Sequence, residues 1–348
     1  MNNYISRKII NKKYIYINKN KQIIKDKKIL DKISKIYIPP AYKNVQIFLN
    51  QDVLAKGIDD AGRTQYVYSE ESKKRREEKK HMKLLKLCNN ISKLEDKIKN
   101  DLSRRTYTKE KLIAVIITLM NKCNFRGGNK KYEENYGSHG LTTLHKSHIQ
   151  FKENCAVIDF IGKKGVQNKC SIKDKSIIKI LKDIYKMSNK NQRYLFAITN
   201  EDKEEITVSL PDVNIYLEKF KITSKDLRTW NANILFLKNL KKNFERFLEG
   251  ENKDNKKDQF DYYSLPEEKQ LKYRKRIIKQ AIIDTAECLH HTAAICKSSY
   301  INKYILNKVL NENLENSNKN NILNKLLKKD KKTKMEDFIK NILKGNSN

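Results

Sequence analysis

The sequence is 348 residues long and strongly basic, with 75 lysines and arginines against 41 aspartates and glutamates and a formal net charge of +34. That length suits two domains with a substantial core. So large a basic excess predicts a polyanionic partner, and the 18 interleaved tyrosines favour nucleic acid over a membrane surface. The alternative is a basic protein whose charge only keeps it in solution.

Other features exclude further classes of protein. The six cysteines contain no C-x-x-C pair, so neither a zinc site nor a disulfide framework is indicated, and they fit a reducing compartment. The absence of a signal peptide and of a membrane-spanning run predicts a soluble intracellular protein. No G-x-x-x-x-G-K-[ST] phosphate loop and no paired-carboxylate motif is found, so we expect an activity that needs no cofactor, neither ATP nor a metal ion.

Residues 1–75 are predicted to form a small β-rich domain. Short runs of Ile, Tyr and Val, such as KYIYI, VQIFL and TQYVY, are separated by proline and glycine, as is typical of strands and turns. Alternation along one strand would place Tyr66 and Tyr68 on one face, close to Arg63 and Gln65 in sequence. These four side chains are candidates for contacts with DNA bases or phosphates; the alternative is ordinary strand packing.

Residues 76–348 are predicted to form a mainly α-helical domain with a β-hairpin sheet, so the whole chain is assigned to the α+β class. An amphipathic helix begins it, with apolar residues at three-four spacing: Leu84, Leu87, Ile91, Leu94 and Ile98. A hydrophobic helix follows at residues 111–122. The polar stretch at 241–270 is interpreted as a loop or insertion between helices, and the C-terminal tail as helical.

Three basic residues of this second part stand in special local contexts. Arg126 lies in FRGGN at a helix end, where flanking glycines allow close approach to a phosphate. Lys163 lies in DFIGKKG, at the predicted hairpin turn. Arg228 lies in the first turn of a helix whose start is marked by Thr223 and Asp226 at capping-box spacing. Each also has a simpler explanation as a solvated surface charge.

The segment 289–301, LHHTAAICKSSYI, brings a plausible nucleophile close to a plausible phosphate ligand, with His291 nine positions before Tyr300. A tyrosine hydroxyl has a pKa near 10, so it attacks only a target that positive donors hold and polarise, such as a phosphodiester. The residues before Tyr300 are interpreted as a turn, and Tyr300 as the start of a new helix. Taken alone, the pair could equally be packing residues.

Taken in order, Arg126, Lys163, Arg228, His291 and Tyr300 resemble the catalytic residues of type IB DNA topoisomerases of the small poxvirus kind, also found in large cytoplasmic DNA viruses. The motifs FRGGN, DFIGKKG, KDLRTW and HHTAAICKSSY carry the resemblance, and IYIPPAY and GRTQYVY extend it to the family's N-terminal DNA-clamping domain. The resemblance covers nearly the whole chain.

The register of two motifs follows from their spacing. His291 rather than His290 matches the family's histidine because it keeps the nine-residue step to Tyr300, and Lys163 rather than Lys164 matches because it directly follows the glycine. The resemblance assigns no function to residues 241–270, because this segment is longer than the corresponding poxvirus pattern.

The resemblance implies a mechanism. Tyr300 would attack a DNA phosphodiester to give a 3′-phosphotyrosyl link, Arg126, Arg228 and His291 would stabilise the transition state, and Lys163 would protonate the 5′-oxygen leaving group. The nicked duplex would rotate and be religated without ATP or metal. The resemblance also implies a monomer that clamps double-stranded DNA and, for a viral protein, a location in the host cytoplasm or the virion.

Two other functions are weighed against this one. A tyrosine recombinase or integrase shares the fold and most of the constellation, but its usual second-arginine motif is H-x-x-R, whereas Lys225 stands three residues before Arg228 here. A recombinase also commonly begins with a helical domain rather than with strands. A non-catalytic DNA-binding protein is the third possibility, and all five filled catalytic positions argue against it.

Overall fold

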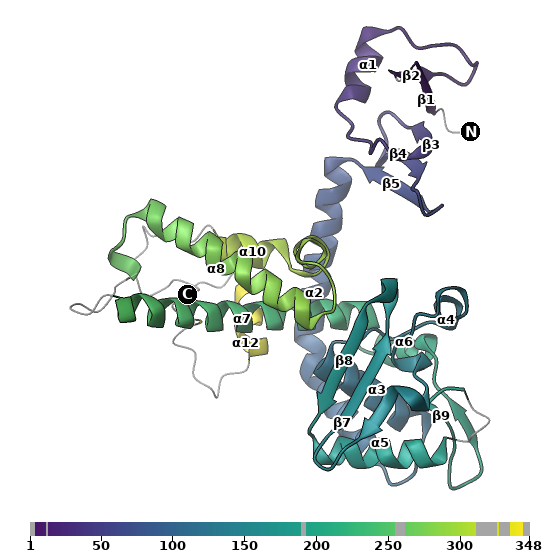
Figure 1. Ribbon diagram of the computed structural model, residues 1–348, viewed down its shortest axis with the longest axis vertical. Coiled ribbons are helices and arrows are strands. Elements are labelled where there is room, and N and C mark those ends of the chain that lie inside the picture. The colour runs from purple at the N-terminus through teal and green to yellow at the C-terminus, as the bar shows by residue number, and fades with distance from the viewer. Residues whose placement is uncertain are drawn as a thin grey trace. The chain divides into compact units, whose positions relative to one another are not determined.

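The computed structural model describes residues 4–343 apart from 12, 189–192, 255–261, 311–325 and 327–334. The chain divides into two compact units, Met1–Lys80 and His81–Asn348 (Figure 1). Helix α2 begins in the first unit and ends in the second. In the part of the chain that is described, no helix is both long enough and apolar enough to cross a membrane.

The first unit is built on a five-stranded antiparallel sheet with strand order β2-β1-β3-β4-β5. The predicted β-rich character of this region is confirmed, but one helix was not predicted: Asp26 caps α1 by accepting hydrogen bonds from the backbone of its first turn. A small core lies between helix and sheet. The elements are β1 (Ile5–Ile10), β2 (Lys13–Ile17), α1 (Lys27–Ser34), β3 (Lys43–Ile47), β4 (Val53–Ile58) and β5 (Thr64–Tyr68).

The second unit is mainly helical, as predicted, and Trp230, Phe125 and Phe236 are among its largest fully buried side chains. Helices α7 and α8 run side by side (Figure 1). The helices are α2 (Glu70–Leu102), α3 (Lys109–Cys123), α4 (Lys130–Tyr136), α5 (Lys175–Met187), α6 (Leu210–Glu218), α7 (Ser224–Asp254), α8 (Glu267–Cys288), α9 (Ala293–Ile295), α10 (Lys303–Leu310) and α12 (Met335–Leu343).

The predicted β-hairpin is confirmed. Strands β6 (Ile149–Phe151), β7 (Ala156–Ile161) and β8 (Gln167–Ile172) form an antiparallel sheet in that order, and the tip between β7 and β8 is a single 3-10 turn, η3 (Lys163–Gly165). A second, two-stranded sheet pairs β9 (Ala197–Thr199) with β10 (Glu205–Thr207).

The loop predicted at 241–270 is wrong at both ends, because α7 continues unbroken to Asp254 and α8 begins at Glu267. The apolar period of the helix extends into this polar stretch: Phe244 is fully buried, and Phe247 packs against Tyr262 and Tyr273. Charged residues therefore fill only the solvent face of a helix whose other face is in the core. Residues 255–261 lie outside the described part of the chain.

The expectation that no disulfide is present is also wrong, since Cys123 and Cys170 are bonded. Cys123 is the last residue of α3 and Cys170 lies in β8, so the packing of helix on sheet brings two cysteines 47 residues apart to a Cα–Cα distance of 5.6 Å. Sequence spacing gives no sign of this contact because it depends on tertiary packing.

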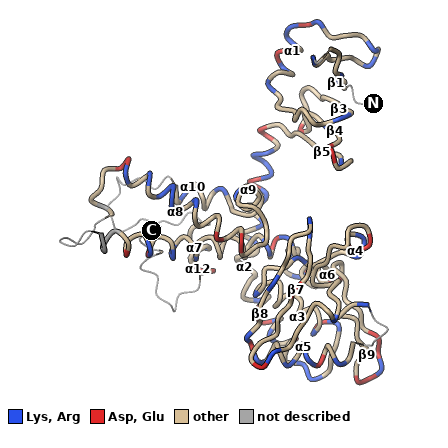
Figure 2. The backbone as a smooth tube through the Cα atoms, in the orientation of Figure 1, with Lys and Arg blue, Asp and Glu red and all other residues tan. Residues whose placement is uncertain are grey.

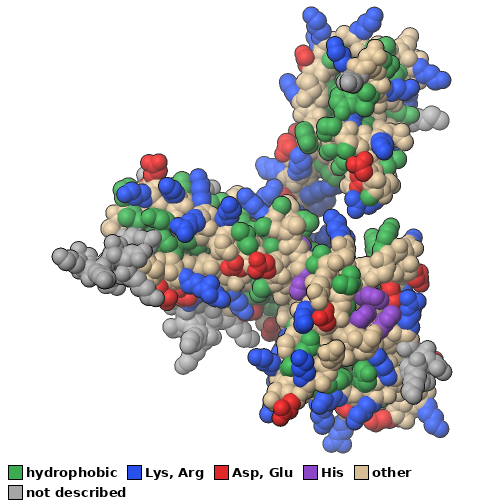
Figure 3. All heavy atoms as spheres, in the orientation of Figure 1, with side chains coloured by type: hydrophobic (Ala, Val, Ile, Leu, Met, Phe, Trp, Pro, Cys, Tyr) green, Lys and Arg blue, Asp and Glu red, His purple; other side chains and the backbone are tan. Residues whose placement is uncertain are grey.

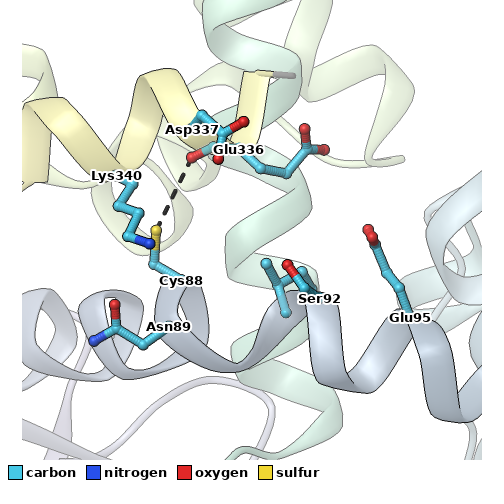
Figure 4. Close-up of a pocket in the computed structure, with 8 residues that line it drawn as sticks. Cys88, Asn89, Ser92, Glu95, Glu336, Asp337 and Lys340 are labelled. Carbon is cyan, nitrogen blue, oxygen red and sulfur yellow. Dashed lines mark hydrogen bonds between the residues drawn. The ribbon is translucent and has the colours of Figure 1, made fainter. Parts of the chain in front are cut away.

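The predicted C-terminal helix is present as α12, and it packs on the second unit through an apolar face, with Met335, Ile339 and Leu343 buried. A small pocket lies between α12 and α2, where the Cys88 thiol faces the Glu336 carbonyl oxygen at 4.0 Å (Figure 4). Apart from Ile91 and Cys88 its lining is polar or charged, and it includes none of the predicted site residues.

Candidate active site around Tyr300

Tyr300 is the last residue of a five-residue π-helix, Cys296–Tyr300, that follows α9 without a break. The prediction of a turn before Tyr300, with Tyr300 opening a helix, is therefore wrong. Thr292 caps the segment, its hydroxyl accepting from the Ile295 amide at 3.4 Å, and the Ile301 amide closes the wide turn on the Cys296 carbonyl at 3.0 Å. Such π-turns are frequent at functional sites.

Asn233 fixes the backbone at Tyr300, and sequence reasoning missed it. It is fully buried in α7. Its amide nitrogen donates to the Tyr300 carbonyl at 3.0 Å, and its amide oxygen accepts from the Asn302 amide at 2.9 Å. The sequence offers no local signal for this role, because the partners of Asn233 lie almost 70 residues further along the chain.

Arg228 is buried at the centre of the site, with 6% of its surface exposed. The predicted capping box is present: the Thr223 amide and hydroxyl both donate to Asp226. Arg228 donates to the carbonyl oxygens of Asn124 and Leu289, tying the ends of α3 and α8 together. Its Nε has no hydrogen-bond partner and, among the described residues, no carboxylate pairs with it. The guanidinium remains charged, so the site is prepared for an anion.

Arg126 is held in the FRGGN loop after α3. Asn124 ends the helix in the left-handed conformation, and the Arg126 carbonyl accepts from the Leu141 amide at 3.0 Å. Gly128, with φ of +95°, lies so close to Gly140 that a Cβ on Gly140 would lie 2.4 Å from the Gly128 Cα. Glycine at both positions is thus required for two backbone segments to meet, and this contact places Arg126.

The two arginines change the acidity of the Tyr300 hydroxyl. Burial alone would raise its pKa, but the nearby guanidinium groups of Arg228 and Arg126 outweigh burial and lower the pKa below its usual value. The Arg228 guanidinium carbon lies 5.5 Å from the centre of the Tyr300 ring. A tyrosine made more acidic between two cations is suited to act as a nucleophile toward an anionic ester.

His291, and not His290, lies against Tyr300. The two rings stack with centroids 4.7 Å apart, whereas His290 faces Phe125. Burial lowers the pKa of His291 to about 4, and the charges of Arg228 and Arg126 act in the same direction. Its Nδ1 lies 3.2 Å from the Thr292 carbonyl oxygen, and its buried Nε2 has no partner. The His291 imidazole is therefore neutral at pH 7, and its Nε2 can bind another ligand.

Lys163 stands apart from these four residues. It is exposed at the tip of the β7–β8 hairpin, where Lys164 and Gly165 both have positive φ. No contact within the described residues joins it to Tyr300, Arg126, Arg228 or His291.

The predicted N-terminal contacts lie in the first unit. Arg63 and Gln65 both donate to one oxygen of Asp59, at 2.7 Å and 2.9 Å, and Arg63 holds the pKa of Asp59 far below its usual value. Tyr66 and Tyr68 share a face of β5, as predicted, with ring centroids 6.2 Å apart. Asp59, which sequence reasoning did not single out, organises the two polar side chains.

The second unit thus brings Arg126, Arg228, His291 and Tyr300 together on a helical core that also carries a hairpin with a basic tip. That combination of a tyrosine, a histidine and two cations defines a site suited to chemistry on a phosphodiester, as in a DNA-processing enzyme.

Comparison with known proteins narrows the class. Residues 69–338 match the family model described as eukaryotic DNA topoisomerase I, catalytic core. DNA topoisomerase 1B of Acanthamoeba polyphaga mimivirus is 28% identical over 300 residues, which cover 84% of this chain and 83% of that protein. DNA topoisomerase 1B of vaccinia virus (strain Copenhagen) is 25% identical over 254 residues, or 72% of this chain and 70% of that protein. The chain belongs to the eukaryotic DNA topoisomerase I catalytic core family, as a type IB enzyme of the viral kind.

Proposed function

We propose that this topoisomerase relaxes supercoiled DNA by transient cleavage of one strand, with Tyr300 as the nucleophile. The Tyr300 oxygen attacks a backbone phosphorus, the bond to the 5′-oxygen breaks, and a 3′-phosphotyrosyl link and a free 5′-hydroxyl result. The reverse attack by the 5′-hydroxyl religates the strand. The observation that carries the proposal is the position of the Tyr300 hydroxyl, which lies near two guanidinium groups that lower its pKa.

Arg126 and Arg228 stabilise the transition state. Negative charge builds on the non-bridging oxygens of the pentacoordinate phosphorus, and two preorganised cations, one of them buried, offset it. Arg228 needs no rearrangement because Asn124 and Leu289 already hold it. His291 is the third ligand: the bound phosphate would favour the protonated imidazole, whose Nε2–H then donates to a phosphate oxygen.

Lys163 is the general acid. Without a proton the 5′-oxygen would leave as a costly alkoxide, and an ammonium group at the hairpin tip can supply that proton. Because Lys163 is exposed and has no contact with the other four residues, its task requires DNA to bring the cleaved strand to the hairpin.

The first unit is assigned to DNA clamping. Arg63, Gln65, Tyr66 and Tyr68 supply donors and aromatic faces for DNA, and Tyr66 is half exposed. Lysines and arginines are distributed along both units (Figure 2), which supports a duplex DNA partner. We place the enzyme as a monomer, without ATP, metal or other cofactor in its reaction, in the cytoplasm of a virus-infected host.

The second candidate is a tyrosine recombinase, because it would cleave a DNA strand by the same chemistry. The family match does not favour it. The discriminating experiment is relaxation of supercoiled plasmid in EDTA without ATP. We expect the wild type to relax the plasmid completely. Failure to relax it, combined with covalent cleavage of a DNA junction, would instead indicate a recombinase.

A further inference from the structure

Three metal-ligating side chains gather in the second unit, outside the site around Tyr300. Glu133 lies in α4, and His139 and His145 lie on either side of the 3-10 turn η1 (Leu141–Thr143). One ligand atom from each lies within 4.8 Å of the other two. Figure 3 shows histidine side chains gathered on the surface of this unit.

Glu133 is the buried member of the group, with 1% of its side chain exposed. Its Oε1 lies 2.8 Å from His145 Nε2 and 3.0 Å from the Arg193 guanidinium. Its Oε2 is also buried, and the Tyr194 hydroxyl hydrogen-bonds to the carboxylate. A buried carboxylate is costly unless it is paired, and a cation bound there would pair with it. Arg193 has 57% of its side chain exposed and is free to move aside.

The two histidines are oriented by second partners, as metal-binding histidines usually are. His139 Nδ1 lies 3.0 Å from the Thr143 carbonyl oxygen and 3.7 Å from Glu133 Oε1. The His145 ring stacks on His148 at 5.1 Å, and the His145 amide donates to His148 Nδ1 at 3.1 Å. These contacts hold both rings against the Glu133 carboxylate.

We propose that Glu133, His139 and His145 bind a divalent transition metal ion, with Zn²⁺ as the best match. Two imidazoles and a carboxylate are a zinc ligand set, leaving the fourth position to water. The ligand atoms around a tetrahedral zinc ion lie roughly 3.4 Å from one another, so a separation of 4.8 Å between two ligand atoms would shrink by about 1.4 Å when the ion binds. The ion would take the place of the proton that His145 and Glu133 share, and this proton would pass to solvent.

An ion at this site would brace the loop that places Arg126. The segment between the two histidines donates from the Leu141 amide to the Arg126 carbonyl at 3.0 Å, and from the Thr142 amide to the Gly127 carbonyl at 2.6 Å. The proposed ion therefore acts on the structure of the loop and takes no part in strand cleavage, so cleavage in EDTA is compatible with it.

Equilibrium dialysis of untagged, chelator-stripped protein against Zn²⁺ tests the proposal. The variants are His139→Gln and His145→Gln, singly and together, and the control is His81→Gln, a histidine outside the group. We expect each single substitution to weaken binding at this site at least tenfold. The double variant should bind one equivalent less than the wild type, and the control should bind as the wild type does. Equal stoichiometry in the wild type and the double variant would overturn the proposal.

The Co²⁺ spectrum of the wild type provides a test that needs no variant to fold. Co²⁺ bound by nitrogen and oxygen in a tetrahedral site should give strong visible absorption without a thiolate charge-transfer band. A thiolate band would place the ion at a cysteine, and the absence of visible absorption would mean that no tetrahedral site exists; either result overturns the proposal.

Discussion

At Tyr300, burial and two guanidinium groups act in opposite directions on one hydroxyl, and the cations prevail. Arg228 has the larger influence of the two and is already locked in place. We expect Arg228→Ala to slow single-turnover cleavage by about 10²–10³-fold, since it removes a preorganised charge from the transition state.

In Arg228→Ala the cleavage rate should also reach its plateau at a higher pH than in the wild type, because the pKa of Tyr300 rises. The matched control is Arg246→Ala, an exposed arginine of the same helix, which should change the rate only a few-fold. A rate for Arg228→Ala within tenfold of the wild type would show that Arg228 does not act on the phosphate.

His291 gives a prediction about pH. Its folded-state pKa of about 4 lies below the value of 6.5 expected for an unfolded chain. As pH falls, His291 is therefore protonated in the unfolded chain before it is protonated in the folded one. The contribution of the neutral His291 to the free energy of unfolding is complete above pH 6.5 and is lost as pH falls toward 4. NMR of labelled histidines, assigned with His291→Asn, should show a midpoint near 4 in the free enzyme and a higher midpoint with bound DNA. A free-enzyme midpoint near 6.5 would contradict the described burial.

At the scale of elements, the hairpin must present Lys163 to the leaving oxygen. We expect Lys163→Ala to slow cleavage of ordinary DNA strongly, and to slow it far less when sulfur replaces the 5′-oxygen, because a thiolate leaves without a proton. Lys164→Ala is the matched control, one residue along the same tip, and should behave as the wild type on both substrates. An equal defect of Lys163→Ala on both substrates would rule out the general acid.

Elements whose signals are local could be predicted from the sequence. The β7–β8 hairpin, the capping box at Thr223 and the long amphipathic helix α2 each follow from a few neighbouring residues. Nonlocal features could not. The length of α7 depends on which apolar residues find a core, and the Cys123–Cys170 bond depends on where α3 meets β8.

The candidate site divides in the same way. Residue types and their order predicted Arg126, Arg228, His291 and Tyr300, and the structure brings these four together. Two supporting residues were not predicted: Asn233 holds the backbone at Tyr300 through partners almost 70 residues away, and Asp59 of the first unit binds Arg63 and Gln65 across a turn. Their side chains are common types in unremarkable sequence contexts.

At the scale of the whole molecule, the net charge of +34 should dominate DNA affinity. Neutralising six to ten phosphates releases counterions, so binding should weaken roughly 10³–10⁵-fold between about 50 mM and about 200 mM salt. Fluorescence anisotropy with Tyr300→Phe isolates noncovalent binding from covalent capture. An affinity that changes less than tenfold over this range would mean that most of the basic residues do not face DNA.

The most direct measurement of the central claim is the chemical identity of the protein–DNA link. The enzyme is trapped on a duplex whose short cleaved fragment dissociates, and the digested adduct is sequenced by mass spectrometry. We predict a 3′-phosphoryl DNA end on the peptide that contains Tyr300, none in Tyr300→Phe, and a normal adduct in the neighbouring control Tyr304→Phe. An adduct at another residue, or one that persists in Tyr300→Phe, would contradict the assignment of Tyr300 as the nucleophile.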